Sequence, residues 1–265
     1  MPKLLLCRPD HYGIEYEINP WMRRGQPANL RLARTQWQQL LETLEHLGAE
    51  VELIPPQPKL PDMVFTANAG LVVDRHFFRS NFRHAERRAE ADHFARWFTQ
   101  HGYTVEKLPE GLYFEGEGDA LFCGNTLVCG YRFRSDVQSH QRLAEFFECL
   151  AVSVELVDAR FYHLDTCFCA LPEGGAFWFP PAFDEYARQA IRQHFAPLIE
   201  VAADEALHFA CNAIVLGRDI VLPAGCPRLA ADLTARGLRC HALPMSEFIK
   251  AGGACKCLTL FLPQR

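Results

Sequence analysis

The sequence has no run of about eighteen apolar residues, so we expect no membrane-spanning helix. Lysine is scarce, with five residues among the 27 basic ones, and the formal net charge is −5. Because a nucleic-acid partner needs a basic stripe to neutralise phosphates, that class of partner is excluded. The N-terminus has only a short apolar run, at Leu4–Leu6, and lacks a signal peptide. We therefore expect a cytoplasmic protein.

Cysteine, in contrast, is abundant, but the eleven residues are scattered and not spaced as in a disulfide framework. In a reducing compartment we expect thiols, most of them packed as small apolar side chains. The sequence lacks a phosphate-binding loop and a dinucleotide fingerprint, so we expect no cofactor. A zinc site at the Cys255-x-Cys257 pair is disfavoured because no second matching pair exists, and we expect no metal.

A repeated pattern organises the whole sequence. An apolar run, a small polar interruption and a second apolar run recur five times, with starts roughly 46 to 49 residues apart. These hairpin-like segments are residues 63–73, 112–122, 161–169, 207–216 and 255–262. Helical apolar spacing follows them at residues 84–100, 135–150, 184–195 and 228–236. Short β-rich stretches complete the units at residues 51–54, 105–108, 154–157, 199–202 and 240–243.

The unit of hairpin, helix and strand predicts an α/β fold. Residues 3–7 form a strand with no partner nearby in sequence, and residues 256–262 end the chain with no helix after them. Pairing these two strands would close a ring of units and leave no open sheet edge. A doubly wound α/β sheet is the alternative. The regular period and the complementary ends favour the ring.

A polar residue lies in the middle of each repeated segment, between apolar residues. Burying a polar side chain there costs free energy unless it has a hydrogen-bond partner. The five positions are Asn68, Glu115, His163, Cys211 with Asn212, and Cys257. Each alone has a structural explanation, such as a core histidine or a turn asparagine. Together they offer a thiolate nucleophile, an imidazole for proton transfer and carboxylates that bind a planar cation. A ring would gather them at its centre, which predicts a catalytic site.

Four motifs in this order resemble those of the pentein superfamily of guanidino-modifying enzymes, and the resemblance covers essentially the whole chain. The motifs are residues 61–68, 114–119, 163–166 and 252–259. The match is closest to the branch of arginine dihydrolase and dimethylarginine dimethylaminohydrolase. It implies one domain over residues 1–265, folded as a five-bladed α/β propeller of ββαβ modules with pseudo-fivefold symmetry.

The resemblance also implies roles for individual residues. Cys257 would be the nucleophile, His163 the acid and base, and Glu115 and Asp165 the carboxylates that orient His163 and the guanidinium. Cys255 is the rival nucleophile, since it shares a face with Cys257 in a strand, but the Cys-Leu-Thr context favours Cys257. The implied substrate-binding residues are Asn19, Asp62, Phe65, Asn68, Arg83, Arg132 and Arg134. Of these, Arg83 and one of the last two arginines would bind the α-carboxylate.

One departure from the family bears on the substrate. Arginine deiminase and dimethylargininase have an aspartate where this sequence has Asn68. A carboxylate only accepts hydrogen bonds, whereas an amide both donates and accepts, so it can hold arginine and then neutral citrulline. This favours an arginine dihydrolase, which converts arginine to ornithine, carbon dioxide and two ammonia molecules.

Other functions stay open from the sequence. Arginine deiminase or dimethylarginine dimethylaminohydrolase would stop at citrulline, on arginine or N-substituted arginine as the small-molecule substrate. An amidinotransferase would need an acceptor amine. A non-catalytic propeller binding protein is disfavoured by the joint presence of Cys257, His163 and Glu115. The sequence does not fix the oligomeric state, and a homo-oligomer stays open.

Overall fold

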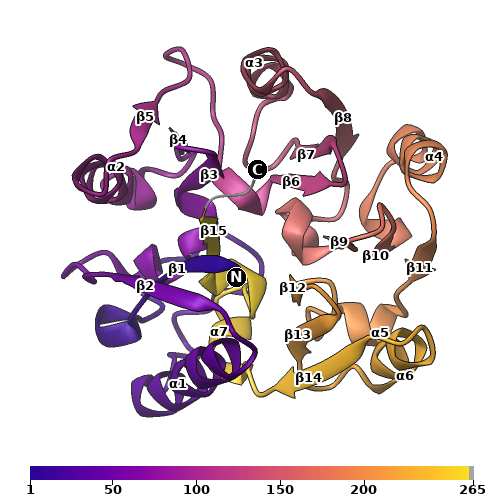
Figure 1. Ribbon diagram of the computed structural model, residues 1–265. Helices are drawn as coiled ribbons and strands as arrows, with labels where there is room; N and C mark the ends of the chain where they lie inside the picture. The colour runs from indigo at the N-terminus through magenta and orange to yellow at the C-terminus, as the bar shows by residue number, and fades with distance from the viewer. Residues whose placement is uncertain (263–265) are drawn as a thin grey trace.

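Five separate three-stranded sheets organise the protein, whose computed structural model describes residues 1–262. The sheets lie around a common centre, and the longer helices cover them on the outside (Figure 1). The α/β class is therefore confirmed, and the alternative of one doubly wound sheet is wrong. Within the described residues, no helix is both long and apolar enough to cross a membrane.

Four of the sheets use elements that are consecutive in the chain. In each, an antiparallel hairpin is followed by a helix that leads to a third strand, parallel to its neighbour. The elements are β3 (Gly70–Val73), β4 (His76–Arg79), α2 (Glu90–Gln100), β5 (Thr104–Glu106); β6 (Ala120–Cys123), β7 (Thr126–Tyr131), α3 (Val137–Phe147), β8 (Leu150–Glu155); β9 (Phe168–Ala170), β10 (Ala176–Trp178), α4 (Glu185–His194), β11 (Leu198–Glu200); β12 (Ile214–Leu216), β13 (Asp219–Pro223), α6 (Pro227–Ala235) and β14 (Arg239–Leu243). Two short helices, α5 (Ala203–Ala206) and α7 (Ser246–Ile249), lie in the connections.

The remaining sheet joins the two ends of the chain. β1 (Lys3–Cys7) pairs antiparallel with β15 (Leu260–Leu262) and parallel with β2 (Glu50–Ile54), after the crossover helix α1 (Leu30–His46). The predicted pairing of the terminal strands is thus confirmed. Figure 1 shows this sheet beside the first and last units of the chain.

The four predicted helices, α2, α3, α4 and α6, have bounds within a few residues of the prediction. α1 was not among the predicted helices. α1 buries Ala33, Trp37, Leu40 and Leu44, which are spaced as one face of a helix. Its N-cap is Asn29, whose side chain accepts a hydrogen bond from the backbone of the first turn. Gly48 and Gly102 follow α1 and α2 with positive φ values of 84° and 76°, a conformation that glycine adopts readily at the ends of helices. α2 starts later than predicted, because residues 85–87 form a separate 3₁₀ turn.

The repeated segments differ from the prediction in one respect. The pattern predicts strands for their first halves, but in four of the five segments 3₁₀ turns lie there, before the first strand of the next sheet. In the remaining segment, residues 207–211 form a turn without a 3₁₀ helix. The 3₁₀ turns are Pro61–Val64, Thr66–Ala69, Gly116–Gly118, Leu164–Thr166 and Lys256–Leu258. The hairpin then forms between the second half and the strand that follows. The expectation that Cys255 and Cys257 share a strand face is therefore wrong, since Cys255 has helical backbone angles at the start of a turn.

Buried cysteines contribute to the apolar core. Nine of the eleven are buried, which confirms that most pack as small apolar side chains. The larger members of the core are aromatic, and they lie between the sheets and the covering helices. Phe77 of β4 stacks on Phe98 of α2 with ring centroids 3.7 Å apart, for example.

Gly116 provides a test of how tightly the turns pack against each other. It has a φ of 61°, and a Cβ added there would lie 2.6 Å from the backbone atoms Ala67 O and Gly70 N. We expect Gly116→Ala to lower the free energy of unfolding by about 3 kcal/mol or more, from backbone strain plus overpacking.

The matched control is Gly124→Ala, where φ is 59° but nothing lies within 4 Å of the added Cβ. It should cost only the strain, about 1–2 kcal/mol. Urea unfolding of both variants measures the difference. Equal losses would contradict the close approach of the turns.

Candidate active site

Cys257 is held by a side chain from the neighbouring unit. The amide Nδ2 of Asn212 donates a hydrogen bond to the Cys257 Sγ, 3.1 Å away. The Oδ1 of the same amide accepts hydrogen bonds from the backbone N–H of Cys257 at 3.1 Å and of Ala254 at 3.0 Å. Asn212 therefore fixes both the thiol and the turn that carries it.

A carboxylate lies against the same thiol. Cys257 Sγ donates to Asp165 Oδ2 at 3.2 Å. Burial, and secondly the charge of Asp165, raise the pKa of the Cys257 thiol well above its usual range, so the resting thiol is protonated. Burial also raises the pKa of Asp165 to about 6, against the opposing charge of Lys256. A positive charge brought to this place would favour the thiolate.

His163 and Arg134 share one carboxylate oxygen. His163 Nε2 lies 2.8 Å from Glu115 Oε2, and Arg134 Nη1 donates to that oxygen at 2.9 Å. Burial alone would raise the pKa of Glu115, but Arg134 and His163 outweigh it and hold this pKa well below the usual range. Burial lowers the pKa of His163 to about 4. At neutral pH the carboxylate is therefore charged and the imidazole is neutral.

These protonation states determine which imidazole nitrogen can act as a base. A carboxylate only accepts, so Nε2 of His163 carries the hydrogen and Nδ1 carries the lone pair. Among the described residues, this buried Nδ1 has no hydrogen-bond partner. The backbone next to His163 is fixed by Asp119, whose Oδ1 accepts from Leu164 N at 3.1 Å. His163 is thus oriented by two carboxylates and keeps one nitrogen for proton transfer.

Asn68 is paired with an arginine that the sequence did not single out. Arg87 Nη1 donates to Asn68 Oδ1 at 2.8 Å. Glu90 in turn accepts from Arg87 Nε at 2.9 Å and Nη2 at 2.8 Å, and both side chains are buried. Arg87 lies outside the four motifs that carry the family resemblance. The signal that could have found it is its place in the stretch Phe82–Arg87, which also resembles the arginine dihydrolase branch.

A small pocket lies at Cys257 and collects most of the predicted substrate-binding residues. It is lined by Ile18, Asn19, Met22, Asp62, Phe65, Asn68, Arg87, Arg134, Tyr162, Ala251, Gly253 and Cys257. Five of the seven predicted substrate-binding residues are in this set, and Arg134 is the member of its pair that lies there. Of the predicted catalytic residues, only Cys257 lines the pocket. Asp165 contacts its thiol, and Glu115 contacts the pocket residue Arg134.

Arg83 and Arg132 are not brought to the pocket. Arg132 pairs with Glu155, and half of its side chain is exposed. The side chain of Arg83 pairs with Asp136 and donates to the backbone oxygen of Arg134, while its backbone N–H donates to Glu115. Arg83 therefore contacts the buried ion pair of Glu115 and Arg134 without lining the pocket.

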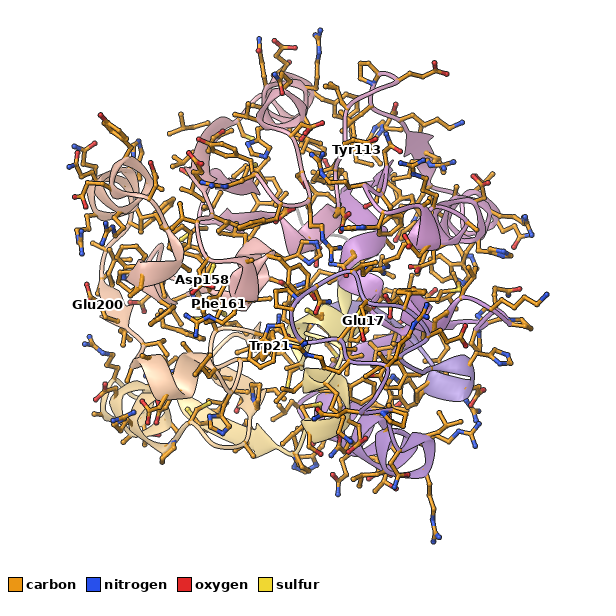
Figure 2. The ribbon with its side chains drawn as sticks, turned by 180° about the vertical axis from the view of Figure 1, so that it is seen from behind. Glu17, Trp21, Tyr113, Asp158, Phe161 and Glu200 are labelled. Carbon is orange, nitrogen blue, oxygen red and sulfur yellow. The ribbon has the colours of Figure 1, made fainter. Side chains whose placement is uncertain are left out.

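The N-terminal loop covers this side of the molecule. Seen from behind in Figure 2, the loop with Glu17 and Trp21 crosses the middle of the molecule. Trp21 Nε1 donates to Arg160 O at 2.7 Å. Asn19, one of the predicted substrate-binding residues, donates to Ala251 O at 3.0 Å and accepts from Trp21 N at 2.9 Å. Its amide thus anchors the loop at the pocket.

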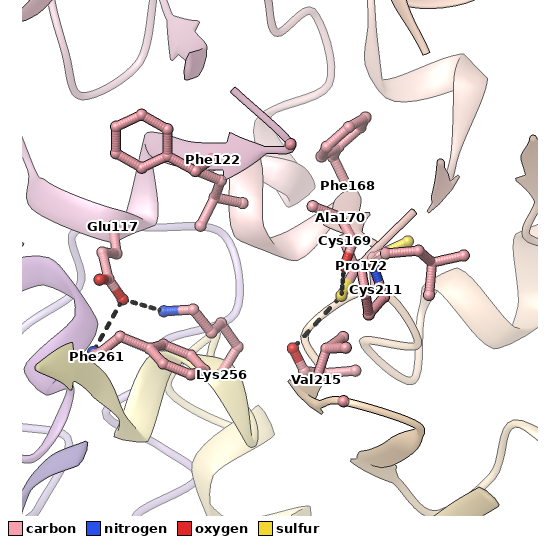
Figure 3. Close-up of a pocket in the computed structure, with 15 residues that line it drawn as sticks. Glu117, Phe122, Phe168, Cys169, Ala170, Pro172, Cys211, Val215, Lys256 and Phe261 are labelled. Carbon is pink, nitrogen blue, oxygen red and sulfur yellow. Dashed lines mark hydrogen bonds and ion pairs between the residues drawn. The ribbon is translucent and has the colours of Figure 1, made fainter. Parts of the chain in front are cut away.

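A second, more apolar pocket is lined by other residues (Figure 3). Its polar feature is the buried ion pair of Lys256 and Glu117, with Nζ and Oε2 2.7 Å apart, and Phe122, Phe168 and Phe261 contribute its walls. None of the predicted catalytic residues lines it. In residues 1–262, no group of three or more His, Cys, Asp or Glu side chains is arranged to hold a metal ion.

Comparison with known proteins places this site in a family. A family model described as N,N dimethylarginine dimethylhydrolase, eukaryotic, matches residues 15–260. ArgZ of Synechocystis sp., a bifunctional arginine dihydrolase/ornithine cyclodeaminase, is 43% identical over 263 residues, which is 97% of this chain and 37% of ArgZ. The N(G),N(G)-dimethylarginine dimethylaminohydrolase of Mycobacterium tuberculosis is 37% identical over 252 residues, 95% of this chain and 83% of that protein.

The structure agrees with these sequence matches. A crystal structure of the N-terminal domain of ArgZ, in a cysteine-to-serine form bound to substrate, matches with a TM-score of 0.96 and 42% identity. The match covers 100% of this chain and 99% of that chain. The chain spans only about 37% of the full length of ArgZ. The chain belongs to the dimethylarginine dimethylaminohydrolase family, on the branch that includes the cyanobacterial arginine dihydrolases.

Proposed function

We propose that this protein is an arginine dihydrolase, which converts arginine to ornithine, carbon dioxide and two ammonia molecules with Cys257 as nucleophile. The observation that carries the proposal is the pairing of a carboxylate, Asp62, with an amide, Asn68, in the pocket of a buried thiol. Such a pair suits a charged guanidinium and also a neutral ureido group. The match to the ArgZ N-terminal domain supports the same activity.

Charged and polar groups around the pocket fit arginine. Asp62 Oδ1 and Asp165 Oδ1 are buried and, within the part of the chain that the structure describes, accept no hydrogen bond. They are the acceptors for the guanidinium N–H groups. Arg134 lines the pocket and supplies a cation for the α-carboxylate. We assign the carboxylate to Arg134, in preference to Arg83 and Arg132. Arg87 is already occupied by Glu90 and Asn68.

The first round of the reaction uses the charge of the substrate. The guanidinium, next to Cys257, lowers the pKa of the thiol, whose proton passes to His163 Nδ1. The thiolate attacks the guanidinium carbon, and His163 returns the proton to the departing ammonia. His163 then takes a proton from water, which attacks the amidino-thioether carbon and expels the thiolate to give citrulline.

The second round repeats these steps on the ureido carbon. Attack by Cys257 and departure of a second ammonia leave a thiocarbamate on the sulfur. Water activated by His163 releases the carbamate of ornithine, which decomposes to ornithine and carbon dioxide. In this round the neutral substrate brings no positive charge to lower the pKa of the thiol. The hydrogen bond from Asn68 to the ureido carbonyl then positions the carbon for attack and stabilises the developing oxyanion.

The fold that carries the site is proposed to be a closed, five-bladed α/β propeller of ββαβ modules, in one domain. Five sheets of the same strand order around a common centre support it (Figure 1). Pairing of β1 with β15, which links the ends of the chain, also supports it.

The ratio of ammonia released to arginine consumed tests the function. We expect two ammonia molecules and one ornithine per arginine from the purified protein. One ammonia with accumulating citrulline would contradict the dihydrolase and indicate a deiminase. Dimethylamine released from dimethylarginine would indicate a dimethylaminohydrolase, and a requirement for an acceptor amine would indicate an amidinotransferase.

Replacing Asn68 by Asp tests the role of the amide. Asn68→Asp presents a carboxylate oxygen to the pocket, which favours the guanidinium and repels the ureido oxygen. We expect citrulline to become the main product, with turnover of added citrulline lowered by at least about tenfold. Asn125→Asp, at an exposed position, is the control and should keep the wild-type product ratio. An unchanged ratio in Asn68→Asp would contradict the assigned role.

Asp165→Asn tests the electrostatics of the thiol. Removing this negative charge should lower the pKa of Cys257, so the pH midpoint of its alkylation by iodoacetamide should move down. At a pH below both midpoints, alkylation should become about tenfold faster for every pH unit by which the midpoint falls. Mass spectrometry measures the rate of alkylation at Cys257 as a function of pH. Asp232→Asn, at an exposed position, is the control and should keep the wild-type midpoint. A midpoint that stays or rises would show that Asp165 does not disfavour the thiolate.

A further inference from the structure

We infer that Glu90, acting through Arg87, is a positioning residue that fixes the amide of Asn68 with its Nδ2 toward the substrate pocket. This orientation makes the pocket favour a ureido group over a guanidinium. The inference deepens the proposed function, because it identifies what allows citrulline to bind for the second round.

The orientation of the amide follows from hydrogen-bond chemistry. A guanidinium only donates, so the oxygen of Asn68 faces Arg87, and the two atoms are 2.8 Å apart. The flipped amide would place its N–H groups against those of Arg87. Because both residues are buried, water could not solvate these opposed donors. Asn68 Nδ2 therefore faces away from Arg87. It is buried and has no hydrogen-bond partner in residues 1–262.

Arg87 can fix the amide only because it is itself fixed. Glu90 accepts two hydrogen bonds from it in the forked arrangement of a carboxylate and a guanidinium. The backbone oxygen of Asp62 accepts a third, at 3.1 Å, and the guanidinium lies over the ring of Phe82. Glu90 starts α2 and does not line the pocket. Its influence on the substrate passes through Arg87.

The pocket consequently presents one acceptor and one donor. Asp62 Oδ1 is an unpaired acceptor, and Asn68 Nδ2 is an unpaired donor, within the described residues. A ureido group has N–H groups for the first and a carbonyl oxygen for the second. A guanidinium has only donors, so it leaves the Asn68 N–H unsatisfied. Sequence alone suggested that both halves of the amide serve the substrate, whereas Arg87 occupies the accepting half.

Binding without turnover tests this inference. In a Cys257→Ser background, calorimetry gives dissociation constants for arginine and for citrulline, with Glu90 and with Glu90→Gln. The glutamine keeps one acceptor and loses the charge, so Arg87 and the Asn68 amide are released. We expect citrulline affinity to fall at least about fivefold more than arginine affinity, as for a buried donor left unpaired. Glu86→Gln, at an exposed neighbouring position, should leave the ratio of the two constants unchanged.

Equal loss of affinity for both ligands, or no loss, would overturn the inference, because a purely structural role does not distinguish them. If circular dichroism shows that Glu90→Gln does not fold, Glu90→Asp takes its place. It keeps the charge and shortens the side chain, and an unchanged affinity ratio in that variant would equally overturn the inference. The ammonia count on the wild-type protein tests the dihydrolase function separately, so the two failures are distinguishable.

Discussion

The buried carboxylate of Glu115 is the constraint on which the site depends. A charge without water needs full compensation, and Glu115 obtains it from Arg134, from His163 and from the backbone of Arg83. These partners come from different units of the chain. The same carboxylate that neutral His163 needs for its orientation thus draws three distant segments together. The packing of these segments around Glu115 therefore depends on charge compensation as well as on burial of apolar side chains.

The turns explain how one fold can serve such a site. In four of the five units a short 3₁₀ turn precedes the first strand, so a polar side chain can point to the centre without interrupting a sheet. Asn68, Glu115, His163 and Cys257 all lie in or at the start of such turns. The sheets behind them stay regular, and the chemistry is confined to the places where backbone hydrogen bonding is already irregular.

Much of this could be predicted from the sequence, because repetition carries information that single residues do not. The period located four of the helices, the third strands and the pairing of β1 with β15, and it placed five polar residues at equivalent positions. The turns themselves could not be predicted, since a polar residue between apolar runs reads as a strand interruption. The partners of Arg83, Arg87 and Arg132 could not be predicted either. Which arginine faces the pocket depends on side-chain directions across units, which no local pattern encodes.

The pairing of the two ends of the chain has a consequence for how the pocket forms. Cys257 lies three residues before β15, the strand that pairs with β1. Every other element of the site is already synthesised when this turn emerges from the ribosome. The turn that carries the Cys257 thiol and the strand that completes the first sheet therefore join the fold together. Pairing of the two ends of the chain also brings this thiol to Asp165 and Asn212.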